Sequence, residues 1–115
     1  MIKVSFDISE NGKTLILTLK GHAGMAEAGK DIVCASASII AYTVAQEVTD
    51  MYNKGRLKKK PNIRLDEGDA TITCKPVKTS MTEALHIYKV AQTGFRLLAE
   101  SYPEYVQLTT FGSKA

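Results

Sequence analysis

The sequence has 115 residues, of which 44% are hydrophobic and 23% charged, and its formal net charge is +3. These values predict one globular domain over residues 1–115, and the small positive charge does not by itself indicate nucleic-acid binding. Since we find no apolar run of the roughly 18 residues that span a membrane, and no signal-peptide pattern, we expect a cytoplasmic protein without a membrane partner. In that reducing compartment, Cys34 and Cys74 are expected to be free thiols.

The first expected elements are two strands joined by a tight turn. Apolar and polar residues alternate over positions 2–8, the pattern of a strand with one buried face. Asn11-Gly12 follows, and this pair is typical of a hairpin turn with positive φ at both central residues. The alternation resumes over positions 15–19 and predicts the return strand, which ends at Gly21.

A helix is expected from about residue 31 to residue 54, because apolar side chains recur three or four positions apart. Asp31 stands at the position of an N-cap, and Gly55 is typical of the residue just past the last turn. A basic loop at 56–62 then leads to the next elements.

A second hairpin has expected strands at 63–65 and 70–74, turned by Glu67-Gly68. Its return strand places Cys74 on an apolar face, which predicts core packing for that thiol.

A second helix is expected to open at Ser80, where Ser80 and Glu83 match a capping box, and to close at Pro103. Residues 105–110 predict a last short strand. The resulting order is β-β-α-β-β-α-β. It favours an α+β domain, in which two main helices pack on a mostly antiparallel sheet.

The segment 21–38 combines a histidine and a cysteine with many small residues. Cys34 is expected in the first helical turn, where the positive end of the helix dipole favours the nucleophilic thiolate. Gly24 and Gly29 let the intervening loop fold back to bring His22 to the sulfur, and that loop is expected to open for substrate. Backbone N–H groups at the helix start would receive the oxygen of a tetrahedral intermediate. The residues alone leave open a second interpretation, a packing surface with an inert cysteine and a solvated histidine.

One pattern joins these residues to their neighbours: Gly21-His22-Ala23, Gly29, Asp31-Ile32-Val33-Cys34-Ala35 and Ser38. The pattern resembles the signature of the ribosomal-processing cysteine protease family (Prp). Chain length and element order fit the same family, so the resemblance covers essentially the whole chain.

The resemblance implies a cysteine endopeptidase that removes the short apolar N-terminal extension of large-subunit ribosomal protein twenty-seven and needs no cofactor. Carried over, Cys34 is the nucleophile, and His22 is the general base that later protonates the leaving amine. Asp31 either caps the helix or orients His22, and we favour the cap. Ser38 lies one turn after Cys34, where it either bonds into the site or permits close packing.

Neither the second histidine nor the His22–Cys34 pair indicates a further site. His86 falls on the polar face of the second helix and is expected to be solvated. A zinc site needs three or four protein ligands, whereas His22 and Cys34 supply two, so no metal site is expected.

The clearest charge cluster comprises Arg56, Lys58, Lys59, Lys60 and Arg64. We interpret it as a solvated loop, and contact with nucleic acid is the less favoured interpretation. It also defines an alternative function, a non-catalytic ribosome-associated binding module that uses the loop 56–64.

Residues 32–45 carry no charged side chain, which implies burial on most sides of that helix. A single sheet in a small domain cannot cover a helix so fully. We therefore expect a homodimer that buries part of this helix or the apolar stripe Ile87, Val90 and Leu97, and the family resemblance implies the same.

Overall fold

A computed structural model describes residues 1–9, 11–24 and 31–110 of the chain. Its elements, in chain order, are β1 (Ile2–Ser9), β2 (Thr14–Lys20), α1 (Ile32–Asn53), β3 (Asn62–Asp66), β4 (Asp69–Cys74), a short 3-10 turn (Lys78–Ser80), α2 (Met81–Ser101) and β5 (Val106–Thr109). The expected order of strands and helices is confirmed.

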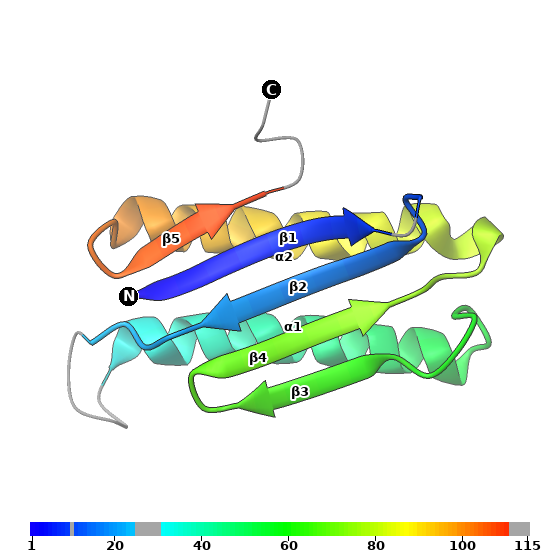
Figure 1. Cartoon of the computed structure of the whole chain (residues 1–115), viewed down its shortest axis with the longest axis horizontal. Coiled ribbons are helices and arrows are strands. Elements are labelled where there is room, and N and C mark those ends of the chain that lie inside the picture. Colours follow the sequence, from blue (N-terminus) through cyan, green and yellow to red (C-terminus); the bar gives the residue numbers. More distant parts are fainter. Residues whose placement is uncertain (10, 25–30, 111–115) are drawn as a thin grey trace.

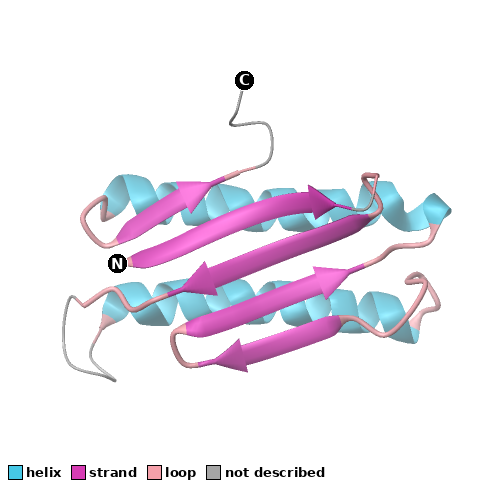
Figure 2. Ribbon diagram, in the orientation of Figure 1, coloured by secondary structure: helices cyan, strands magenta, loops and turns pink. Residues whose placement is uncertain are grey.

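The strands form one sheet in the order β3-β4-β2-β1-β5. All neighbouring strands are antiparallel except β1 and β5, which are parallel because α2 crosses over between β4 and β5. Both helices lie on the same face of the sheet (Figures 1 and 2). The expected α+β architecture, a mostly antiparallel sheet with two helices packed on it, is therefore confirmed.

The helix-facing side of the sheet is apolar because each central strand alternates. Its buried residues are Ile2, Val4, Phe6, Leu15, Leu17, Leu19, Ala70, Ile72 and Cys74. Tyr88 of α2 packs edge-on against Phe6, with ring centroids 6.3 Å apart, and donates its hydroxyl to the Ile72 carbonyl oxygen at 3.0 Å. Cys74 is 1% exposed and belongs to the core, as expected, and this burial raises the pKa of its thiol to about 11.

Local turn chemistry explains most element boundaries. Asn11 and Gly12 have φ of 60° and 80°, so the expected hairpin turn is confirmed. Gly55, with φ of 73°, follows the last residues of α1, as expected for a glycine past a helix end. The capping box at Ser80 and Glu83 is wrong: within the described structure the Ser80 side chain makes no capping hydrogen bond. Ser80 instead ends the 3-10 turn and is itself buried.

By length and composition alone, helix α1 is long and apolar enough to cross a membrane, although the sequence shows no uninterrupted apolar run of that length. Small polar residues interrupt its apolar ones without adding charge. The core helix of a globular domain can have the same length and composition, and the inner side of α1 is buried in the hydrophobic core. We therefore interpret α1 as a core helix.

Candidate active site

The end of β2 and the start of α1 lie at the same end of the molecule (Figure 1). Gly21 follows β2 with φ of 94° and donates its backbone N–H to the Gly68 carbonyl oxygen at 2.9 Å. His22 comes next, exposed at the surface, and its carbonyl oxygen accepts a hydrogen bond from the Met1 amino group. The backbone around His22 is therefore held from both sides.

Asp31 is the N-cap of α1, as expected. Its backbone is extended, and its Oδ1 accepts the N–H groups of Val33 and Cys34, each at 3.0 Å. The side chain is buried, so the cap fixes the first helical turn and the direction of the Cys34 side chain.

The same bonds correct the expectation of free oxyanion donors in that turn. The N–H groups of Val33 and Cys34 donate to the Asp31 side chain, and that of Ala35 donates to the Asp31 carbonyl oxygen at 3.0 Å. These three N–H groups already have acceptors in Asp31, so they are not free oxyanion donors in this structure.

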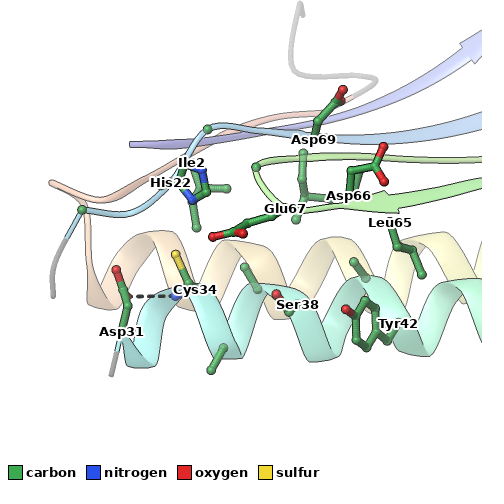
Figure 3. A pocket seen from close by; sticks show the side chains of 18 residues that line it. Ile2, His22, Asp31, Cys34, Ser38, Tyr42, Leu65, Asp66, Glu67 and Asp69 are labelled. Carbon is green, nitrogen blue, oxygen red and sulfur yellow. Dashed lines mark hydrogen bonds between the residues drawn. The ribbon is translucent and has the colours of Figure 1, made fainter. Parts of the chain in front are cut away.

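Cys34 is joined to the histidine segment by a direct contact. Its Sγ, half-buried, accepts the backbone N–H of Ala23 at 3.4 Å. A donor aimed at sulfur stabilises negative charge there, and Ala23 is the immediate neighbour of His22. Figure 3 shows the sulfur pointing from α1 toward the layer that carries His22.

A cavity of about 580 Å³ opens at this place. It is lined by every expected site residue that the structure describes: His22, Gly24, Asp31, Cys34 and Ser38. Ser38 is exposed one turn after Cys34, and Gly24 has φ of 72°. Gly29, the remaining expected residue, lies outside the described residues. Within the described ranges, no cluster of three or more His, Cys, Asp or Glu side chains is arranged to hold a metal ion.

The opposite wall of the cavity was not expected from the sequence. It consists of the β3–β4 turn (Glu67 and Gly68) with the flanking residues Leu65, Asp66 and Asp69. Figure 3 shows Glu67 extending from this turn over the space beside Cys34. The turn itself was predicted, but its place beside His22 depends on the pairing of β2 with β4, which local patterns do not reveal.

Ion pairs link the start of β4 to the end of β2 and to β3. Asp69 pairs with Lys20, its cross-strand partner, and with Arg64 at 3.0 Å. The Lys20 hydrogen bond, followed by the Arg64 charge, lowers the pKa of Asp69 below its ordinary value. The carboxylate therefore remains ionised at neutral pH and keeps both cations close to the turn.

Comparison with known proteins gives consistent matches. A family model described as cysteine protease Prp matches residues 1–107. A curated Staphylococcus aureus protein, named ribosomal processing cysteine protease Prp, is 28% identical over 108 residues, which are 94% of this chain and 97% of the relative. A crystal structure of the essential ribosomal processing protease Prp from S. aureus, with a covalently linked product peptide, has a TM-score of 0.71 at 27% identity, over 96% of this chain and 99% of that chain. A structure of that protease with a substrate peptide has a TM-score of 0.67 at 25% identity, over the same shares of both chains.

Proposed function

This chain belongs to the Prp family of cysteine proteases, and from that premise we propose that Cys34 is its nucleophile and His22 its general base. The proposed substrate is large-subunit ribosomal protein twenty-seven, from which the enzyme removes a short apolar N-terminal extension in the cytoplasm. The sequence pattern of residues 21–38 supports this, as do the S. aureus relative named for ribosomal processing and its complex with a substrate peptide.

The observation that carries the proposal is the contact between the Ala23 N–H and the Cys34 sulfur. It joins the end of β2 to the first turn of α1, so that a histidine and a cysteine from different elements line one cavity. A cysteine with a purely structural role does not require a capped helix start and a cavity that a histidine also lines.

In the proposed reaction, His22 takes the Cys34 proton and the thiolate attacks the scissile carbonyl carbon. The tetrahedral intermediate collapses when the carbon–nitrogen bond breaks, and the imidazolium gives its proton to the leaving amine. Water, deprotonated by His22, then attacks the thioester, which releases the new carboxylate and restores the thiol. Since the cap occupies the N–H groups of Val33 and Cys34, the oxyanion donors must come from other groups around the cavity.

The cavity suits an apolar peptide in extended form. Its α1 side has small side chains at Ala35, Ser38 and Ala41, which leave room for substrate side chains. Tyr42 and Leu65 lie along the same cavity and supply apolar surface. An apolar extension therefore finds both space and apolar contacts beside the sulfur.

The test is incubation with the ribosomal protein that bears its extension, followed by mass measurement of the products. Cys34→Ala and His22→Gln are expected to abolish cleavage and to keep the fold. The chain offers matched controls, since Cys74→Ala and His86→Gln remove the same residue types from the core and from the exposed face of α2. If Cys34→Ala cut the substrate at the wild-type rate, Cys34 would not be the nucleophile.

A second candidate function uses the basic loop 56–64. Backbone hydrogen bonds from Lys58 to Lys75 at 2.8 Å and from Val77 to Arg56 at 3.0 Å fasten its first part to the segment after β4. Arg56 pairs with Glu83 at 2.8 Å, whereas Lys58, Lys59 and Lys60 are exposed. Exposed lysines on a loop whose start is fastened would suit contact with ribosomal RNA or an acidic protein.

Ribosome co-sedimentation separates the two candidates. A binding module predicts that the triple variant Lys58→Gln, Lys59→Gln, Lys60→Gln loses ribosome association, while Cys34→Ala behaves as wild type in every assay. The protease hypothesis predicts that Cys34→Ala stops cleavage, whereas the triple variant still cuts a short peptide.

The proposal includes a homodimer. Its support is apolar surface on the outer side of both helices, where Ile39 is 62% exposed, Val90 59% and Leu97 53%. Val90 also lines a cavity between the helices together with Ile40 and Ile87. Burying this surface against a second copy would remove it from water.

A further inference from the structure

The imidazole of His22 lies directly against Gly68 of the β3–β4 turn. A Cβ atom added to Gly68 would lie 2.6 Å from His22 Nε2, 3.1 Å from Cε1 and 3.3 Å from Cδ2. Ordinary contacts of a Cβ begin at 3.4 Å, so the ring occupies the space that any other residue would fill. The edge of the ring that carries Nε2 faces the turn.

The turn is fastened to the backbone that carries this histidine. Gly21 donates its N–H to the Gly68 carbonyl oxygen at 2.9 Å, and Lys20 pairs with Asp69 as its cross-strand partner. Gly68 therefore cannot recede from the ring without breaking contacts at the end of β2. Its position is set by the sheet, and the histidine side chain adapts to it.

We propose that Gly68 is a positioning residue for His22: by lacking a side chain, it sets how closely the imidazole lies to the β3–β4 turn and so fixes the orientation of the ring in the cavity that Cys34 also lines. This inference rests on the proposed role of His22 in proton transfer. His22 is exposed and follows a strand end, where a histidine would otherwise sample several rotamers. Contact with the turn on one side restricts the orientations of the ring.

Substitution of Gly68 should move the ring and leave the fold intact. A methyl group at Gly68 requires the ring to retreat by about 0.8 Å to reach ordinary contact distance. The end of a side chain moves at little cost, whereas proton transfer depends steeply on geometry. A displacement of about 1 Å can cost a hundredfold in rate, so we expect a fall in kcat of about 10- to 100-fold with little change in KM.

The control must reproduce the backbone effect of the substitution without the contact. Gly68 has φ of 71°, a value that strains an alanine. Gly55 has φ of 73°, and no atom lies within 4 Å of the place that a Cβ would take there. It follows the end of α1, away from the cavity. Gly55→Ala therefore carries the same strain and spares the histidine.

The experiment compares wild type, Gly68→Ala and Gly55→Ala by kcat and KM on a substrate peptide and by thermal unfolding. The proposal predicts similar losses of melting temperature in both variants and a loss of kcat in Gly68→Ala alone. Asparagine tolerates positive φ better than alanine, so Gly68→Asn and Gly55→Asn repeat the comparison with less strain. Wild-type kcat in Gly68→Asn or Gly68→Ala would overturn the proposal.

Histidine ring NMR gives a readout that does not require substrate. The chain has two histidines, so a His86→Gln variant identifies the His22 resonances. The His22 shifts should change in Gly68→Ala and remain unchanged in Gly55→Ala, and unchanged His22 shifts in Gly68→Ala would refute the contact. Failure of the protease mechanism is a different result: His22→Gln would then cut the substrate at the wild-type rate, whatever Gly68→Ala did.

Discussion

Replacement of Asp31 by alanine tests whether this carboxylate serves the helix or the histidine. Asp31 is buried, and its Oδ1 accepts the N–H groups of Val33 and Cys34 at 3.0 Å each. Loss of an N-cap side chain costs about 1 kcal/mol on average and about 2 kcal/mol in strong cases. Because two bonds are lost at a buried site, we expect a loss of about 2 kcal/mol, which lowers the melting temperature by about 8 °C in a domain of this size.

Serine at the same position separates the two roles, because it caps a helix about as well as aspartate but carries no charge. If Asp31 acts only as a cap, Asp31→Ser should recover most of the melting temperature and most of the cleavage rate that Asp31→Ala loses. Thermal unfolding followed by circular dichroism, together with kcat on the same protein samples, measures both quantities.

Two results would refute this reasoning. An Asp31→Ala protein that melts at the wild-type temperature would show that the two N–H bonds contribute nothing. An Asp31→Ser protein that melts as wild type, but cuts as slowly as Asp31→Ala, would show that the negative charge itself is needed. The carboxylate would then act on His22 as well as on the helix.

Three further predictions concern other parts of the molecule. Iodoacetamide at about pH 8 should label Cys34 and spare Cys74, whose pKa burial raises to about 11; equal labelling in mass spectra would contradict this. Asp69→Asn should lower the melting temperature above about pH 4, because the lowered pKa means that the ionised carboxylate stabilises the fold. The difference from wild type should shrink as the pH falls through the lowered pKa of Asp69, and an undiminished difference at about pH 2 would contradict the pairing. Leu97→Asp should change the sedimentation from that of a dimer to that of a monomer. A wild-type protein that sediments as a monomer would contradict the proposed homodimer.

Local signals in the sequence were sufficient where the structure depends on neighbours in the chain. Asn11-Gly12 predicted a hairpin because few other pairs accept positive φ twice, and Asp31 predicted a helix start because its carboxylate reaches two N–H groups. The capping box at Ser80 failed although its residue types were right. The chain enters α2 through a 3-10 turn that buries Ser80, so the preceding backbone overrode the local pattern.

The site was predictable only on the side that one continuous segment supplies. His22, Asp31, Cys34 and Ser38 all come from residues 21–38, and the structure gathers them around one cavity. The opposite wall comes from the β3–β4 turn, which reaches His22 only because Lys20 and Asp69 are cross-strand partners. No periodicity or spacing within either segment reports that pairing, because a hairpin pattern does not say which strand lies next to it.

Two features of the structure explain why residues 32–45 of α1 carry no charge: burial in the core and the lining of the cavity. The sequence indicated only the burial. Its inner side is buried in the core, as at Val33 and Val44. A second side, with Cys34 and Ser38, lines the cavity, where small uncharged residues leave room for the proposed apolar substrate. Only the remaining outer side, exemplified by the exposed Ile39, bears on the proposed dimer. The absence of charge over residues 32–45 is therefore weak evidence for a dimer, and the exposed apolar residues of α2 are the stronger support.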